Sequence, residues 1–209
     1  MQPSIIEQVS TKKKRLAITI NIATGSHVPN AMLDLLRKHG VREATFFLTG
    51  MWVKANPGIA RRIKKMGFEI ASHGHQHKNY TTKTNAWIEK DILTAQKYIY
   101  RATGVKPRMI RTPSGDIDMR VARKLQSLKQ TIVHWDTDSL DWKLQDINHI
   151  VRRVVPCARP GSIVLLHACD PWTQSLKAVP LILSGLKKRG FKFVSVSQLL
   201  SVNDHARLK

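Results

Sequence analysis

Short apolar runs alternate with longer amphipathic stretches along most of this chain. The run at residues 16–22 is rich in β-branched side chains and stops at a glycine-containing turn, which is typical of a buried strand. Residues 29–39 then place apolar side chains on one helical face before a closing glycine. The same alternation predicts further strands at 44–48, 68–71, 109–112, 131–136, 162–167 and 191–196, and further helices at 57–67, 85–103, 118–128, 146–155 and 174–189.

Strands that alternate with helices through short turns predict an α/β fold with parallel strands. A distorted barrel of the (β/α)7 type, closed or nearly closed, fits the pattern best. We expect a basic N-terminal extension over residues 1–14, one domain over residues 15–202 and a C-terminal tail over residues 203–209. In such barrels the reactive side chains lie at the carboxyl ends of the strands, so the residues that follow each apolar run are candidates for the site.

The charge of the chain adds a set of possible partners. The 209 residues include 35 Lys and Arg against 14 Asp and Glu, a formal net charge of +21. A surface this basic attracts polyanions, so anionic cell-wall polymers, nucleic acid and acidic lipid surfaces are all candidates. The cations are spread over the predicted helices and accompany no recognised nucleic-acid motif, which disfavours specific nucleic-acid binding. We expect a monomer.

Cysteine content and hydropathy limit the cellular context. The two cysteines, Cys157 and Cys169, cannot form a disulfide framework, although one bridge between them stays open. No apolar run is long enough for a membrane span, and residues 1–15 lack the order of a signal peptide. An extracellular or cell-wall location would therefore require an export signal or anchor upstream of this sequence.

Three histidines lie within five residues, directly after the apolar run at 68–71. Because a strand end can deliver His73 and His77 to one place, their imidazoles could ligate a transition metal ion. A catalytic site usually has three protein ligands, and His75 is a candidate for the third nitrogen. The alternative is a solvent-facing, histidine-rich turn.

Two further strand ends carry candidate chemistry. Arg111 begins an Arg-Thr-Pro-Ser-Gly turn, in which Pro113 and Gly115 would fix a tight bend and direct the guanidinium inward. A structural ion pair is the alternative. His167 follows four apolar residues, where burial and an acidic neighbour could hold its pKa near neutral for proton donation. The alternative is a buried histidine with a purely structural hydrogen bond.

An acidic loop lies between Trp135 and Trp142. Indole rings suit a wall on which sugars stack, and a carboxylate between them could tune a nearby base. An ordinary polar loop between a strand and a helix is the alternative. The three carboxylates of the loop belong to Asp136, Asp138 and Asp141.

In this order, these segments resemble the polysaccharide deacetylase family with the NodB homology domain, over about residues 15–200. The resemblance implies a NodB-type barrel that removes acetyl groups from N-acetylated sugars in chitin, peptidoglycan or related cell-wall polymers. The matching motifs are the two histidines four residues apart at His73 and His77, the Arg-x-Pro-x-Gly turn at 111–115, the Asp-Trp pair at Asp141 and Trp142, the Leu-x-His at 165–167 and the Ala-Thr-Phe-Phe strand at 44–47.

The resemblance also implies a mechanism, in which a divalent metal ion held by one Asp and two His polarises the acetyl group. A second Asp takes the proton of water and a His protonates the leaving amine. Carried over to this chain, the metal, zinc or cobalt, would be held by His73 and His77. The implied catalytic residues are His167, Asp141, Arg111 and the position of Asn21, and the implied substrate contacts are Trp142, Pro113, Ser114 and Leu165.

The chain departs from the family at the end of its first predicted strand. The family has Thr-Phe-Asp-Asp-Gly, whereas residues 19–23 read Thr-Ile-Asn-Ile-Ala. Aligned on the threonine, Asn21 replaces the base and Ile22 replaces the metal ligand. If Gly25 is the anchor, Ala23 and Thr24 fill the two places, and the carboxylates are missing either way. Gly74 and Ser114 also stand where the family often has a hydroxyl residue and an aromatic residue.

An amide cannot accept the proton of water and an isoleucine cannot ligate a metal, so we expect metal binding to be weak or absent and deacetylation to be weak or lost. Asp136, Asp138 and Asp170 are candidates for a substitute base. The alternative function is that of a pseudoenzyme, which binds carbohydrate of the cell wall without catalysis.

Overall fold

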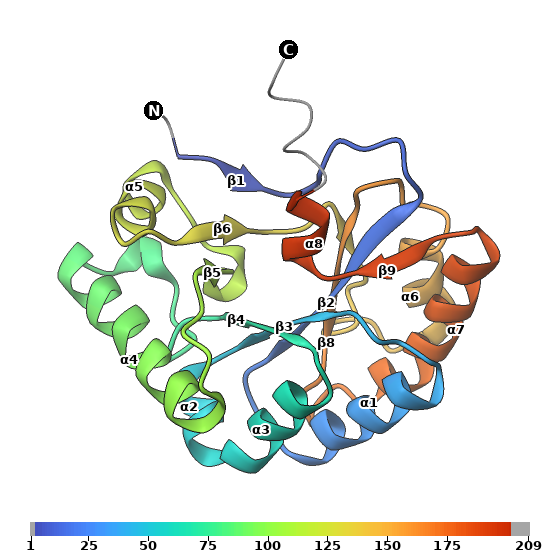
Figure 1. The fold of residues 1–209 in the computed structure, drawn as a ribbon, viewed down its shortest axis with the longest axis horizontal. Helices are drawn as coiled ribbons and strands as arrows, with labels where there is room; N and C mark the ends of the chain where they lie inside the picture. The colour runs from blue at the N-terminus through green and yellow to red at the C-terminus, as the bar shows by residue number, and fades with distance from the viewer. Residues whose placement is uncertain (1–2, 202–209) are drawn as a thin grey trace.

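The computed structural model describes residues 3–201. One parallel sheet curls through the molecule and helices cover its outer side (Figure 1). The strands are β1 (Ile5–Ile6), β2 (Arg15–Ile22), β3 (Thr45–Leu48), β4 (Glu69–Ser72), β5 (Met109–Ile110), β6 (Thr131–Val133), β7 (Thr137–Asp138), β8 (Ile163–His167) and β9 (Lys192–Val194). The helices are α1 (His27–Lys38), α2 (Gly50–Ala55), α3 (Pro57–Lys65), α4 (Asn85–Thr103), α5 (Met119–Ser127), α6 (Ile147–Val154), α7 (Gln174–Lys188) and α8 (Val196–Ser201), with 3-10 turns at Tyr80–Thr82 and Pro113–Gly115.

The strands run in the order β1-β6-β5-β4-β3-β2-β8-β7, and β9 pairs with the amino-terminal end of β2. All the pairs between these strands are parallel, which confirms the predicted distorted barrel of parallel strands with outer helices. Within residues 3–201 the end strands β1 and β7 do not pair with each other, so the barrel is open instead of closed.

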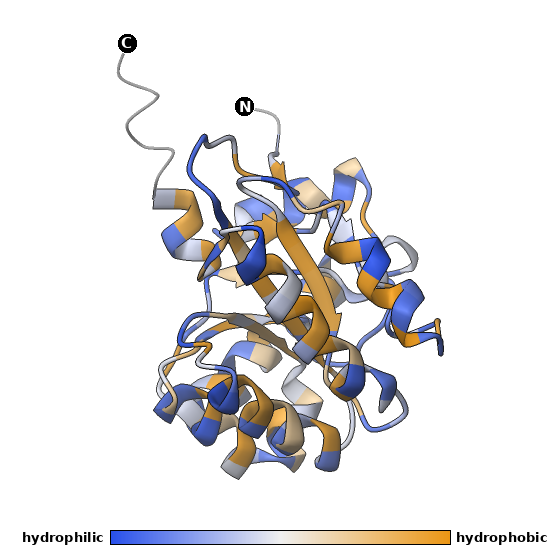
Figure 2. Cartoon of the chain, turned by 90° about the vertical axis from the view of Figure 1, so that its right-hand side faces the viewer, coloured by the Kyte–Doolittle hydropathy of each residue, from blue (hydrophilic) through white to orange (hydrophobic). Residues whose placement is uncertain are grey.

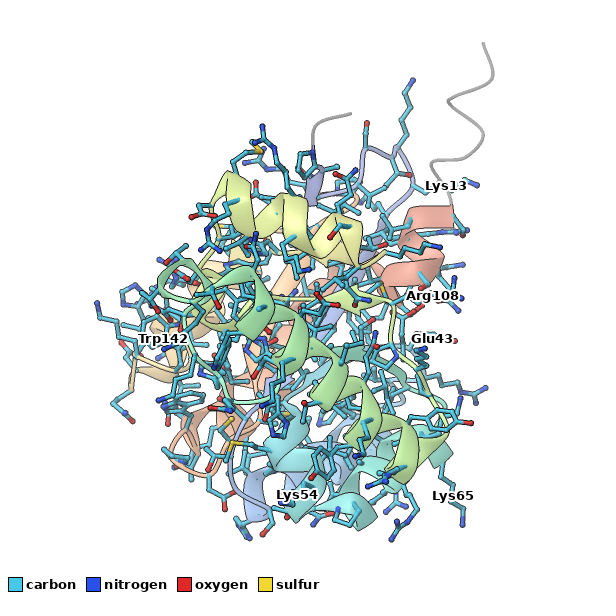
Figure 3. All side chains as sticks on the ribbon, turned by 90° about the vertical axis from the view of Figure 1, so that its left-hand side faces the viewer. Lys13, Glu43, Lys54, Lys65, Arg108 and Trp142 are labelled. Carbon is cyan, nitrogen blue, oxygen red and sulfur yellow. The ribbon has the colours of Figure 1, made fainter. Side chains whose placement is uncertain are left out.

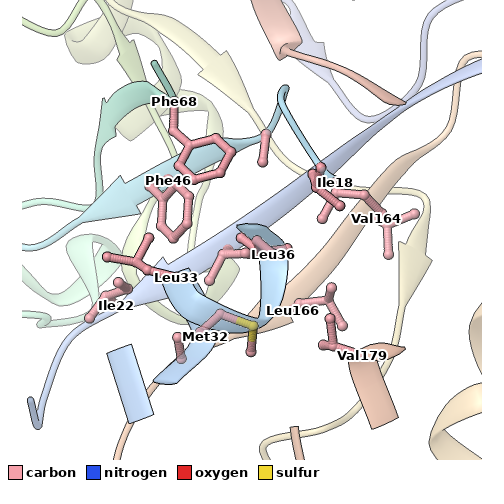
Figure 4. Close-up of a cluster of buried hydrophobic side chains, with 14 of the residues drawn as sticks. Ile18, Ile22, Met32, Leu33, Leu36, Phe46, Phe68, Val164, Leu166 and Val179 are labelled. Carbon is pink, nitrogen blue, oxygen red and sulfur yellow. The ribbon is translucent and has the colours of Figure 1, made fainter. Parts of the chain in front are cut away.

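The two faces of β2 have different surroundings, because side chains alternate along a strand. Ile18 and Ile22 lie on the outer face, in the main hydrophobic cluster between the sheet and its helices. Ile22 is fully buried there, near Met32 and Leu33 of α1 (Figure 4). Asn21, on the inner face, lines a pocket. The long strands are correspondingly apolar, whereas the helices alternate apolar and polar residues (Figure 2).

Several segments differ from the expectation. The segment expected as an extension contributes β1, which pairs with β6, and the buried side chain of Val9. The predicted strand at 131–136 ends at Val133, because residues 134–136 cross the opening of the barrel and Asp136 is tied to β8 through Ser162 and Ile163. Helices α2 and α8 were not predicted. The predicted domain end at residue 202 and the tail at 203–209 lie outside the described residues.

Other sequence expectations concern cysteines and membrane spans. Cys157 is exposed, Cys169 is buried, and both thiols are free, so the possible bridge is not formed. Among the helices of residues 3–201, none has the length and apolar character needed to cross a bilayer.

Candidate active site

A pocket of about 310 Å³ opens at the carboxyl ends of the strands. Asn21 comes from the end of β2, His73 and His77 from the loop after β4, Asp138 from β7 and His167 from the end of β8. The register explains part of this convergence, because Asn21 pairs directly with His167 on the neighbouring strand. The parallel strands therefore bring together, at their carboxyl ends, side chains that are far apart in the sequence.

His167 rests on a buried carboxylate. Its Nδ1 lies 2.8 Å from Asp141 Oδ1, and its backbone N–H donates to Asp141 Oδ2 at 2.8 Å, so two hydrogen bonds join the residues. Ser175 donates to the same Oδ2 at 2.8 Å, and Gln174 donates to the Asp141 backbone oxygen. Asp141 is fully buried, and these donors fix the carboxylate behind the imidazole. The arrangement can orient His167 as a proton donor.

Asn21 lies on β2, the strand beside that of His167, and is held by Arg111. The Arg111 guanidinium donates from Nη1 to Asn21 Oδ1 at 2.9 Å, and from Nε and Nη2 to the backbone oxygens of Val133 and His134. It lies 4.1 Å from the centre of the Phe47 ring. Arg111 is fully buried, and burial lowers its pKa to about 9, against the raising influence of Asp138. Arg111 thus acts on the pocket through Asn21.

The hydrogen bonds around His73 define its tautomer. His73 Nδ1 lies 2.8 Å from the Arg111 backbone oxygen, which can only accept, so Nδ1 carries the proton and Nε2 carries the lone pair. Asn21 Nδ2 lies 3.3 Å from that Nε2, and since Asn21 Oδ1 faces Arg111, the amide donates to the imidazole. Burial first, and His77 second, lower the pKa of His73 well below its ordinary value. The lone pair of a neutral His73 is therefore occupied by Asn21.

The other two histidines of the cluster separate. The ring centre of His77 lies 4.9 Å from that of His73, on the pocket side. His75 instead stacks on Tyr98 of α4, with ring centres 5.4 Å apart, and does not line the pocket. The suggestion of His75 as a third metal ligand is therefore wrong. In an extended segment His73, His75 and His77 would point to the same side. Gly74 and His77 adopt positive φ angles of 71° and 53°, so the segment is not extended and His75 turns away.

The histidine loop is held by a residue that the sequence reasoning missed. Asp91 of α4 accepts from the backbone N–H groups of His75 and Gln76 and from the hydroxyl of Tyr80. A Cβ at Gly74 would lie 2.6 Å from that hydroxyl and 2.9 Å from Asp91 Oδ2. The close approach requires glycine here, which explains the absence of a hydroxyl residue after His73.

The predicted substrate contacts lie largely on the pocket wall. Ser114 and Leu165 line it, as does Trp142, which is 43% exposed. Pro113 does not; it is buried beside Gly74, so its assignment as a substrate contact is wrong and it supports the loop instead. Three further residues that line the pocket were not predicted from the sequence: Ala23, Cys169 and Trp172. Their positions directly after β2 or β8 were the signal that could have identified them.

Two of the three candidates for a substitute base have structural roles. Asp136 accepts from Ser162 Oγ and from the backbone N–H of Ile163. Asp170 accepts from three backbone N–H groups at the start of α1, and although burial raises the pKa of its carboxyl group, these hydrogen bonds outweigh it and lower the pKa. Asp138 lines the pocket and is the remaining candidate.

The donor set does not fit a catalytic metal ion. In the part of the chain that the structure describes, no three His, Cys, Asp or Glu side chains come close enough to share one ion. His73 and His77 supply two imidazoles, but Asn21 caps one of them and Ile22 points into the core. The residues present therefore do not complete a three-ligand site for a metal ion.

The open barrel with its pocket at the strand ends is a (β/α) scaffold of the kind that carries its active site at the carboxyl ends of the strands. A family model described as polysaccharide deacetylase matches residues 8–133, and the chain belongs to that family. It is 34% identical, over 196 residues, to the peptidoglycan-N-acetylglucosamine deacetylase of Bacillus cereus, with 92% of this chain and 91% of that protein covered.

Two other relatives are similar over nearly the whole chain. The uncharacterized protein YlxY of Bacillus subtilis is 31% identical over 208 residues, and the chain covers 63% of its length. The crystal structure of BA3943, a CE4 family pseudoenzyme of Bacillus anthracis, superposes with a TM-score of 0.88 at 30% identity and covers 96% of this chain and 70% of that one. A mutant of BA3943 is described as having restored enzymatic activity.

Proposed function

We propose that this protein binds N-acetylated cell-wall glycan in the pocket and that its deacetylase activity is weak or lost. The observation that carries the proposal is the hydrogen-bonded position of Asn21 between Arg111 and His73. In the family reaction a carboxylate at this place removes the proton of the attacking water. The Asn21 amide offers a donor to His73 and its oxygen to Arg111, so no basic atom faces the water.

The size of the expected loss follows from general-base catalysis, which typically contributes about 10²–10⁴ in rate. Asp138 is the one carboxylate that lines the pocket among the described residues, and its Oδ1 already accepts from the Leu140 backbone N–H at 2.8 Å. Without a metal that polarises the acetyl group, such a base would work on an unactivated amide. We therefore expect any residual acetate release to be slow.

The features needed for binding are retained. Three indoles, those of Trp135, Trp142 and Trp172, line the pocket, and flat apolar rings of this kind stack on sugar faces. His167, held by Asp141, can donate a hydrogen bond to a glycan oxygen just as it would donate a proton to an amine. The pocket volume of about 310 Å³ suits one sugar residue with its acetyl group.

Several finer expectations stay proposals. Zinc or cobalt would bind weakly at His73 and His77, if at all, for the reasons given above. Peptidoglycan or chitin-type glycan outside the cell is the proposed ligand. Attraction to anionic polymers, the lack of specific nucleic-acid binding and a monomeric state also remain predictions.

Binding and hydrolysis can be tested together with chitooligosaccharides and peptidoglycan fragments. Calorimetry should show binding by the wild type, and enzymatic acetate detection should show little release. Trp142→Ala should weaken binding by about tenfold, because an exposed stacking ring is lost. Tyr100→Ala is the matched control, since Tyr100 is an exposed aromatic side chain of α4 that does not line the pocket. Acetate release at ordinary enzymatic rates would contradict the proposal, as would equal affinities of the two variants.

A further inference from the structure

Charge is divided between the two ends of the barrel. Because all strands are parallel, the loops that precede them meet at one end and the loops that follow them meet at the other. The end where the following loops meet carries the carboxylates of Asp116, Asp118, Asp146 and Asp170, with that of Asp138 at the end of β7, against the cations of Lys78, Lys83 and Lys143. Exposed cations gather at the other end of the barrel, here called the basic face. Lys13, Arg42, Arg108 and Lys129 lie in the preceding loops, Lys65 ends α3 and Lys192 begins β9.

The basic face lies on the far side of the molecule from the pocket. Figure 3 places Lys13, Lys65 and Arg108 along one side and Trp142 on the opposite side. Trp142 lines the pocket. A partner on the basic face would therefore leave the pocket free.

The cations of this face are not neutralised within the protein. None of the six forms an ion pair with a carboxylate in residues 3–201. Basic residues in the last turn of a helix can serve the helix dipole, as Lys65 can in α3, but Lys13, Arg42 and Arg108 lie outside helices. Helix capping therefore does not account for the face as a whole.

The distribution of charge favours a flat partner over a linear one. The cations surround this end of the barrel, whereas the hollow between them has mixed charge, with the two carboxylates of Glu43 and Glu69 beside the cations of Lys64, Lys106 and Arg108. A polyanion threaded through that hollow would meet both carboxylates, but a plane resting on its rim would meet mainly cations. An anionic phospholipid surface has this planar geometry, and each Lys or Arg near it contributes independently.

We propose that the basic face binds an anionic phospholipid membrane and thereby directs the pocket away from the membrane, toward the glycan. The attraction needs no inserted apolar segment, because it is electrostatic and acts within about a Debye length of the surface. The carboxylates near the pocket are repelled by an anionic surface, so the uneven charge also turns the pocket end of the domain away from the membrane.

Vesicle co-sedimentation of the complete chain tests this interaction. The probes are vesicles of phosphatidylglycerol mixed with phosphatidylcholine, vesicles of phosphatidylcholine alone, and soluble linear polyphosphate. One variant combines Lys13→Glu, Arg42→Glu, Lys65→Glu and Arg108→Glu. The control combines Lys54→Glu, Lys90→Glu, Lys143→Glu and Lys177→Glu, which changes the net charge equally at exposed positions outside the basic face. Circular dichroism establishes that both variants are folded.

We expect the wild type to bind the anionic vesicles in low salt, to release them in about 0.5 M NaCl and to ignore neutral vesicles. The basic-face variant should bind at least about tenfold more weakly, and the control should lose far less. Equal losses in both variants would show that net charge acts without a defined face. Binding to polyphosphate without binding to anionic vesicles would contradict a membrane partner and indicate a linear wall polymer instead. Binding to neither probe would contradict any role of the basic face in binding polyanions.

Discussion

On the β8 side of the pocket His167 rests on the buried carboxylate of Asp141, whereas on the β2 side His73 lies against the neutral amide of Asn21. Both arrangements satisfy their hydrogen bonds, because Asp141 has several donors and Asn21 bridges a donor and an acceptor. Only His167 keeps an ionisable side chain, that of Asp141, as its hydrogen-bond partner. The comparison shows that a site can lose its charge on one side and stay fully hydrogen-bonded, so that its shape survives the loss of its chemistry.

The largest effect should come from the residue beside Asn21 on the same strand. Ile22→Asp would place a carboxylate in the hydrophobic cluster, where Ile22 is fully buried, and should cost more than about 4 kcal/mol of stability or prevent folding. Ile22→Val, which keeps the position apolar, should cost about 1 kcal/mol. Urea denaturation measures both. A well-folded Ile22→Asp protein would show that this side chain can turn toward the pocket after all.

Destabilisation by Ile22→Asp would also show that aligning the family motif does not by itself tell which side chains face the pocket. Aligned on the threonine, Asn21 and Ile22 take the places of the two family carboxylates, but only Asn21 reaches the pocket. The alternation of Ile18, Ile20 and Ile22 on one face of the strand was the signal for a core position of Ile22, and the comparison of motifs did not use it. The periodicity was the more reliable guide here, because burial constrains a strand more strictly than a short motif does.

Other parts of the structure were less accessible to prediction. The long strands and helices have clear apolar periods, whereas β1 and β7 have two residues each, too few for a period. The placement of His75 depends on the turn at Gly74, which brings it against α4. Asp91 lies within an amphipathic helix, and its hold on the histidine loop is a contact between distant segments that no local pattern contains.

A second prediction concerns the acid sensitivity of the Arg111 side. Burial, and then the charge of Arg111, lower the pKa of His134 to about 4. An unfolded chain protonates this histidine at about pH 6.5, so the unfolded state binds more protons between these values and stability falls as the pH drops through that window. The loss should reach about 3 kcal/mol. His134→Gln should lessen this pH dependence in urea titrations from pH 7 to pH 4, and an unchanged slope would exclude His134 as its source.

A third prediction concerns the Asp141 side. Asp141→Asn would point amide hydrogens at one or more of the donors that now converge on the carboxylate, and should cost about 2 kcal/mol of stability at pH 7. Asp118→Asn is a suitable control, since Asp118 is an exposed helix cap and asparagine caps about equally well. Equal small effects of both changes would mean that the Asp141 carboxylate is not needed to hold His167.

A smaller but more specific effect is expected when the β2 side regains its charge. Asn21→Asp places a carboxylate next to Arg111, which favours its ionised form, and should raise acetate release from chitooligosaccharides at least about tenfold in the presence of zinc or cobalt. Asn148→Asp, an exposed change on α6, should leave the release at the wild-type level. If Asn21→Asp is folded and as inactive as the wild type, the pocket has diverged in more than its charge.

The most direct test of the role of Asn21 is a calorimetric zinc titration of the wild type, Asn21→Asp and the combination of Asn21→Asp with His73→Ala. Asn21→Asp removes the amide hydrogen bond from the lone pair of His73 Nε2 and adds a negative charge beside it, so the variant should bind zinc at least about tenfold more tightly than the wild type. Adding His73→Ala should abolish that gain. Equal zinc affinity of the wild type and Asn21→Asp would contradict the conclusion that Asn21 disables this side of the pocket.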